Sequence, residues 1–211
     1  MKHTRSSAEW EIRDAVVAWI REELPRARVV HELVVGSCRA DVAAVTPDKV
    51  YLWEIKSERD TLDRLKAQLK TFDACAHHTI LVAHRKWFDT KPYNNGAPRL
   101  AWDEELSGGW LRDVWCYPRP EESTHRWNFT NDMIAGMRQP HAVRLLGLLW
   151  KAELVDLARR HMVRVNDRLA MGAIIDVLVW HLDGRQICEG VCAALRRREF
   201  AEADEPIGGV S

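Results

Sequence analysis

Two carboxylates and a lysine on neighbouring predicted strands are the residues of this chain best suited to chemistry. Asp41 lies in one apolar stretch, and Glu54 and Lys56 lie in a second, after a turn at residues 46–49. Because strand side chains alternate between faces, Glu54 and Lys56 point to one face and Ile55 to the other. A hairpin would bring Asp41 beside them. Converging carboxylates bind a hard cation such as Mg²⁺, and a nearby lysine can orient or deprotonate its bound water.

A structural ion pair between Glu54 and Lys56 is the plainer interpretation, and it stays open at this point. Against it, Glu54 lies in the sequence VYLWEIK and Asp41 in ADVAAV. A lone carboxylate in such an apolar strand is costly to bury. The combination therefore favours a metal site suited to phosphodiester hydrolysis.

The spacing of hydrophobic residues along the chain predicts the helices and strands that position these residues. A helix is predicted at 8–24, where Trp10, Val17, Ile20 and Leu24 recur at helical spacing, and a second helix at 60–76. Strands are predicted at 29–35, 38–45, 50–57 and 78–84, and a fifth between Gly109 and Pro118. The helix between the third and fourth strands is a crossover, so the sheet is mixed and the class is α/β.

The C-terminal part of the chain has a different period. Helices are predicted at 140–162, 171–182 and 186–198, and the tail at 201–211 is acidic, contains glycine and is expected to be flexible. The predicted organisation is a core at 1–120, a helical region at 131–200 and this tail.

Composition limits the function classes. The 211 residues carry 31 basic and 31 acidic side chains, so any polyanion contact must come from local patches. The five cysteines form no CxxC pair, which indicates a reducing compartment. No apolar run reaches the length of a membrane span, so a cytoplasmic protein without a membrane partner is expected.

The residues around Asp41 and Glu54-Ile55-Lys56 resemble the PD-(D/E)XK nuclease superfamily, which includes restriction enzymes, Holliday-junction resolvases and RecB-type nucleases. The likeness covers residues 8–84, and Ala40 stands where the family often has proline. It implies a restriction-endonuclease-like fold and a Mg²⁺-dependent nuclease, with Mn²⁺ able to substitute, that cleaves DNA in repair, recombination, restriction or mobile-element processing. Asp41, Glu54 and the Ile55 carbonyl would hold the metal, and Lys56 would be catalytic.

Two further positions follow from this resemblance. Gln68 stands where RecB-type members have the glutamine of a Q-x-x-x-Y pattern, and it would join the catalytic site. An acid on the first helix would complete the metal shell; Glu11 is preferred, with Glu9 and Glu32 as alternatives.

Several arginines are candidates for contact with DNA, with RNA as an alternative. They are Arg39, Arg64, Arg159, Arg160, Arg164 and Arg168. The last four lie in the helical region, which resembles a SAP-type DNA-binding module; a bundle packed against the core, or a homodimer contact, is the alternative. The rival functions are a catalytically inactive nucleic-acid-binding protein with the same fold and a structural protein.

Overall fold

The computed structural model describes residues 7–89, 101, 113–118, 127 and 139–207, and five strands in these ranges form one sheet. The strands are β1 (Arg28–Val35), β2 (Cys38–Val45), β3 (Val50–Lys56), β4 (His78–His84) and β5 (Asp113–Tyr117). Their spatial order follows the sequence. The first three are antiparallel neighbours, whereas β4 lies parallel to β3 and β5 parallel to β4. The predicted mixed α/β sheet is confirmed.

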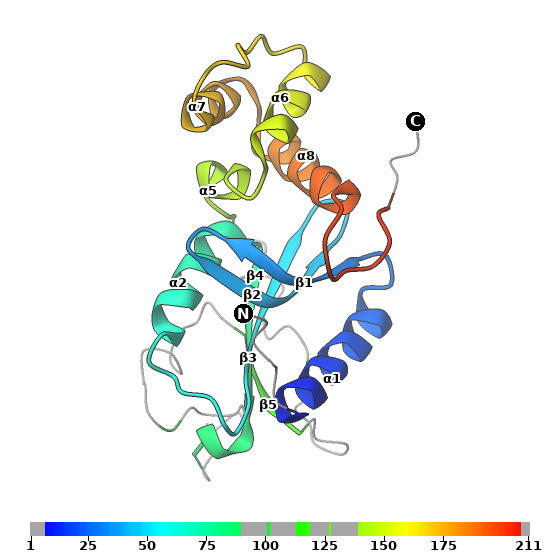
Figure 1. The fold of residues 1–211 in the computed structure, drawn as a ribbon, viewed down its shortest axis with the longest axis vertical. Helices are drawn as coiled ribbons and strands as arrows, with labels where there is room; N and C mark the ends of the chain where they lie inside the picture. The colour runs from blue at the N-terminus through cyan, green and yellow to red at the C-terminus, as the bar shows by residue number, and fades with distance from the viewer. Residues whose placement is uncertain (1–6, 90–100, 102–112, 119–126, 128–138, 208–211) are drawn as a thin grey trace.

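Helices cover both faces of this sheet. They are α1 (Ser7–Glu23), α2 (Leu65–Cys75), α5 (Ala142–Leu146), α6 (Lys151–Arg160), α7 (Met171–His181) and α8 (Gly184–Arg197), with a short 3₁₀ helix at Arg85–Trp87. Figure 1 shows α1 and α2 on opposite sides of the strands, and α5–α8 gathered at one end. None of the described helices is long and apolar enough to cross a membrane.

Alternation along β3 determines which face carries the candidate site. Tyr51, Trp53 and Ile55 pack with Trp19 of α1 in one hydrophobic cluster. Leu52, one residue out of phase, belongs to the cluster on the other side of the sheet, which includes residues of α2. Glu54 and Lys56 share the phase of Leu52, so they point to the face that α2 covers.

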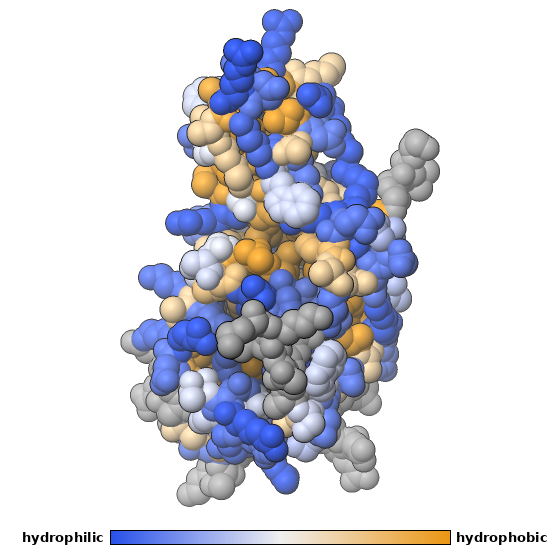
Figure 2. Space-filling model, in the orientation of Figure 1, coloured by the Kyte–Doolittle hydropathy of each residue, from blue (hydrophilic) through white to orange (hydrophobic). Residues whose placement is uncertain are grey.

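The C-terminal helices share a hydrophobic core with the sheet. Val45 and Val50, at the ends of β2 and β3, belong to the same buried cluster as Leu145 of α5 and Leu195 of α8. Figure 2 shows apolar atoms at the surface in the band where this region meets the sheet, with hydrophilic side chains projecting beyond it. The geometry is that of a bundle packed against the core.

Two local predictions differ most from the structure, in addition to the helix predicted at 60–76, which begins only at Leu65. The helix predicted at 140–162 is divided into α5 and α6, because Trp150 is extended and its N–H donates to the Glu153 carboxylate at 2.7 Å, which begins a new helix. Residues 201–207, predicted to belong to a flexible tail, lie against β1. There the His31 N–H donates to the Glu202 carbonyl, and the Asp204 N–H donates to the Val29 carbonyl.

Candidate functional site

Beyond the last paired residues of β2 and β3, the carboxylate of Asp41 accepts a hydrogen bond from the backbone of β3. The antiparallel pairing of these strands runs up to Val42 and Trp53, which puts Asp41 opposite Glu54 if the register continues. At this point the Ile55 N–H donates to Asp41 Oδ2 at 2.6 Å. Asp41 is thereby fixed beside Glu54, as the predicted hairpin requires.

Glu54 is the most deeply buried acid of the site. It is 2% exposed, and Lys56 Nζ donates to its Oε1 at 2.7 Å. Its other oxygen, Oε2, has no hydrogen-bond partner among the described residues. Gln68, half-buried on α2, lies near enough for its side-chain amide to favour the charged form of Glu54, but it makes no hydrogen bond of normal geometry to Oε2. The structure therefore brings Asp41, Glu54, Lys56 and Gln68 together.

A buried arginine at the edge of this site pairs with three carboxylates, one of which is Asp41. Oxygens of Glu9, Glu32 and Asp41 lie within 4.8 Å of one another. Arg13, whose side chain is 0% exposed, places its Nη2 at 2.9, 3.2 and 3.6 Å from them, in that order. Its Nη1 also donates to the Asp41 carbonyl. The guanidinium thus acts as an internal cation for the cluster.

Backbone conformation contributes to this cluster at Glu32. Its φ is +57°, a left-handed value that is uncommon for residues other than glycine. The β1–β2 pairing includes His31 with Val42 and Leu33 with Ala40, but it skips Glu32, which would lie opposite Asp41. Strain of this kind persists where the surroundings enforce it and often occurs at functional sites.

Burial makes the acidic pair reluctant to ionise. The pKa of Asp41 is raised well above its usual value, first by desolvation and then by the Glu54 carboxylate; the Ile55 N–H, Arg13 and Lys56 oppose this shift. Desolvation also raises the pKa of Glu54, against the effects of Lys56 and Gln68. Such a pair is relieved by a proton or by an added cation.

The structure places the other candidates outside this pair. Glu11 is exposed and lies near Tyr117, whose pKa its charge helps to raise, whereas Glu9 faces the cluster. Residues two apart on a helix point to different sides, so α1 brings only one of these acids to the site. Arg39 and Arg64 are exposed, and Arg39 lies 3.5 Å from Glu32.

Arg159, Arg160, Arg164 and Arg168 lie in or after α6, in the helical region. All four are exposed. They belong to a surface separate from the residues of Asp41 and Glu54.

Arg13 is the residue that sequence reasoning missed. The available signal was its position four residues after Glu9, on the helix face that also carries the buried Ile12 and Val16. An i, i+4 pair of this kind normally lies at the surface. Only the placement of Glu32 and Asp41 explains its burial.

The fold and site define an α/β protein with a buried acidic pair on a mixed sheet. A family model described as bacteriophage P4 protein cII matches residues 2–90, which contain α1, the first four strands and the whole acidic site. Protein cII of Enterobacteria phage P4 is 27% identical over 202 residues, covering 93% of this chain and 70% of that protein. No solved structure matches.

These similarities correct the functional prediction. The assignments to the PD-(D/E)XK nuclease superfamily, to Mg²⁺-dependent DNA hydrolysis and to enzymes in general are wrong, because the matches are to phage P4 protein cII and not to a nuclease. The hydrolase and endonuclease descriptions fail with them, and the alternative function, a nucleic-acid-binding or structural protein derived from a nuclease, has no support from these matches either. The geometry of the acidic site needs another explanation.

Proposed function

We propose that this chain is a regulatory protein of phage type that acts by binding and not by catalysis. The observation that carries the proposal is the similarity to phage P4 protein cII, which extends over 93% of the chain and includes both the sheet and the C-terminal helices. A similarity of this extent favours a shared mode of action for the whole fold.

In this function the acidic pair is a binding site for one divalent cation. We propose that Asp41, Glu54 and the Ile55 carbonyl hold Mg²⁺ or Mn²⁺, with Lys56 and Gln68 positioning Glu54. The unpartnered, buried Oε2 of Glu54 supports this, since a buried acceptor normally has a partner. Oxygen ligands suit Mg²⁺, and its charge would offset the repulsion between the two carboxylates. The cation would stabilise the β2–β3 hairpin, whose second strand pairs with β4.

DNA is the proposed partner, with RNA as an alternative outcome of binding tests. The chain has no net charge, so recognition of a polyanion depends on local arginines. Arg39 lies 3.5 Å from Glu32, Arg64 is exposed just before α2, and the arginines in and after α6 supply a second basic surface. Self-association into a homodimer stays a prediction, and sedimentation of the purified chain decides it.

The detailed topology is also a proposal. A restriction-endonuclease-like arrangement is supported by the order of a helix, three antiparallel strands, a crossover helix and a parallel fourth strand, with the C-terminal helices as an appendage. This concerns architecture only, since the same architecture can serve different functions.

The regulatory role can be tested in cells that carry phage P4 without its protein cII. This chain is supplied from a plasmid, and phage transcripts are measured against an empty plasmid. We expect reproducible changes in transcript levels and intact phage DNA. Unchanged transcripts, with the chain folded and abundant, would contradict the proposal.

A further inference from the structure

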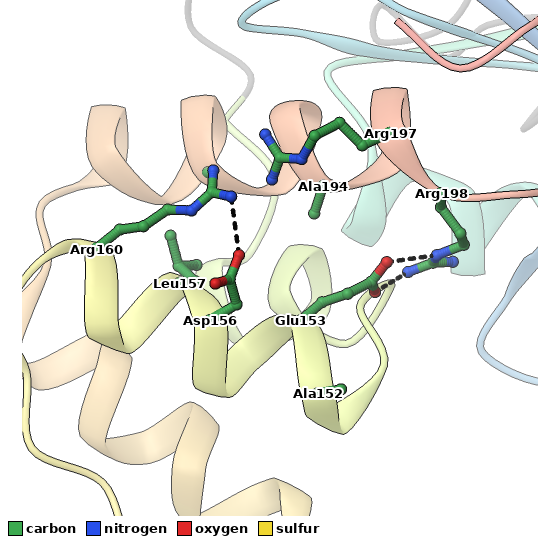
Figure 3. Close-up of a pocket in the computed structure, with 9 residues that line it drawn as sticks. Ala152, Glu153, Asp156, Leu157, Arg160, Ala194, Arg197 and Arg198 are labelled. Atoms are coloured by element: carbon green, nitrogen blue, oxygen red, sulfur yellow. Dashed lines mark hydrogen bonds and ion pairs between the residues drawn. The ribbon is translucent and has the colours of Figure 1, made fainter. Parts of the chain in front are cut away.

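A groove between α6 and α8 has a charge arrangement that the proposed cation site does not use. It has a volume of about 260 Å³ and is lined only by residues of these two helices and the position after α8. Figure 3 shows the side chains of Arg160 and Arg197 extending toward each other across it, from opposite helices. The groove belongs to the helical region and contains none of the residues around Asp41.

Both acids of this groove already have a cationic partner. Glu153 Oε1 accepts from Arg198 Nε at 2.8 Å, and Arg198 also donates to the Leu148 carbonyl and lies over the ring of Trp150. Asp156 forms an ion pair with Arg160 at 2.9 Å. Each of the two carboxylates is therefore already paired with one arginine, and the groove contains a third arginine.

Arg197 is that third arginine. It is half-buried, and no carboxylate of the described residues lies within ion-pair distance of it. Its pKa is lowered, first by burial and then by the neighbouring positive charge of Arg160, while the nearby carboxylates of Asp156 and Glu153 oppose this shift. Two guanidinium groups held on one groove repel each other, and an anion between them would remove this repulsion.

The groove depends on close approach of the two helices at Gly190. A Cβ at this position would lie 2.4 Å from Leu157 Cδ1, so glycine lets the Leu157 side chain pack directly against α8. Leu157 of α6 and Ala194 of α8 are the buried apolar residues that line the groove together with the arginines.

We propose that this groove binds a phosphate group of the DNA backbone through Arg160 and Arg197. Guanidinium groups bind phosphate oxygens in pairs of parallel hydrogen bonds, which a point-charge lysine does not match. A second pocket is lined by residues at and after the end of α6, among them Arg159 and Arg164, and it offers contacts to neighbouring phosphates. This inference rests on the proposed function, because it names the surface that meets DNA.

The experiment measures binding of a fluorescently labelled duplex of arbitrary sequence over a series of salt concentrations. Arg197→Gln is the first variant, since it removes a charge that has no ion-pair partner, and Arg160→Gln/Arg197→Gln is the second. We expect the double variant to bind on the order of tenfold more weakly, with a salt slope smaller by about 2. Arg185→Gln, an exposed arginine of the same helix paired with Glu189, is the matched control and should bind as the unaltered chain does.

Several results would overturn the proposal. They are unchanged affinity in the double variant, an equal loss in the Arg185 control, or binding of poly-glutamate that the variant loses while DNA binding persists. Circular dichroism and urea unfolding check that the variants fold. Absence of DNA binding by the unaltered chain also rejects the groove, whereas the transcript measurement in phage P4 tests the regulatory role separately.

Discussion

The acidic site and the α6–α8 groove are both charged, but their charges are arranged in opposite ways. At the acidic site four carboxylates surround two internal cations, Arg13 and Lys56. In the groove three arginines face two carboxylates, both already paired. One region has more carboxylates than cations, with Glu54 fully buried and the other acids partly buried, and the other region has more cations than carboxylates.

This difference separates two kinds of ligand. A buried carboxylate oxygen without a partner is suited to a small, hard cation that can enter the sheet edge. An open arginine pair is suited to a phosphate presented from outside. The internal cation Arg13 has a structural role in the first region, whereas Arg197 is free to meet a ligand in the second.

Replacing Arg13 should produce the largest effect, because it leaves three partly buried carboxylates without the buried cation that pairs with them. We expect Arg13→Met to lower the free energy of unfolding by about 3–5 kcal/mol, measured by urea denaturation. Arg39→Met is the control. The Arg39 side chain is 61% exposed and comes no closer than 3.5 Å to Glu32, so we expect the free energy of unfolding to change by no more than about 0.5 kcal/mol. Similar losses in the two variants would show that the burial of Arg13 has no special importance.

Magnesium should stabilise the acidic region and leave the groove unaffected. At about 100 times the dissociation constant, a ligand that binds only the folded state adds about 2.7 kcal/mol to the free energy of unfolding. Asp41→Asn should abolish this gain, and Asp63→Asn, at an exposed position before α2, should keep it. A gain that persists in Asp41→Asn would place the cation elsewhere.

A methyl group at Gly190 tests the packing beneath the groove. Because its Cβ would overlap Leu157, we expect Gly190→Ala to cost about 1–3 kcal/mol in thermal or urea unfolding. Adding Leu157→Ala should cost less in this background than in the original chain, since the overlap is removed. Gly172→Ala, where no atom lies within 4 Å of the added carbon, should not destabilise α7.

The raised pKa values of Asp41 and Glu54 predict the pH dependence of the free protein. Above the usual carboxyl pKa, the unfolded chain releases protons that the folded chain retains, so the free energy of unfolding falls as pH rises toward the raised values. One such proton contributes a slope of at most about 1.4 kcal/mol per pH unit. Urea midpoints should show a smaller slope in Asp41→Asn; an unchanged slope would assign the effect to other groups.

Sequence reasoning reached the central strands well because their signals are local. The bounds of β2 and β4 agree with the predictions, since apolar runs end there at recognisable turns. Strand alternation and a short hairpin predicted correctly that Asp41, Glu54 and Lys56 lie close together. Gln68 came near Glu54 because the crossover helix packs on the same face.

The predictions failed where distant contacts decide the outcome. On α1 the predicted apolar stripe included Trp10, which is 42% exposed, whereas Trp19 is buried among aromatic residues of β3 and β5. Glu9 faces the cluster in place of Glu11 because Arg13 orients that side of the helix. The tail at 201–207 is held by Arg21 and Arg28 through Asp204, contacts that composition cannot reveal.

The nuclease prediction placed the site residues correctly but assigned them the wrong function. An acid opposite Glu-x-Lys describes a geometry, and the geometry was found. The same geometry is also compatible with cation binding without turnover, so it does not by itself assign an activity, and the similarity to phage P4 protein cII overturned the nuclease assignment. Residue types at a site limit the ligand more firmly than they determine a reaction.

The central claim is that the protein binds and does not cleave. The most direct measurement incubates an end-labelled duplex with the purified chain and Mg²⁺ or Mn²⁺, and analyses each sample on native and denaturing gels. We expect retarded but full-length DNA, with retardation weakened in Arg160→Gln/Arg197→Gln. Metal-dependent shortening of the DNA that disappears in Lys56→Ala would contradict it.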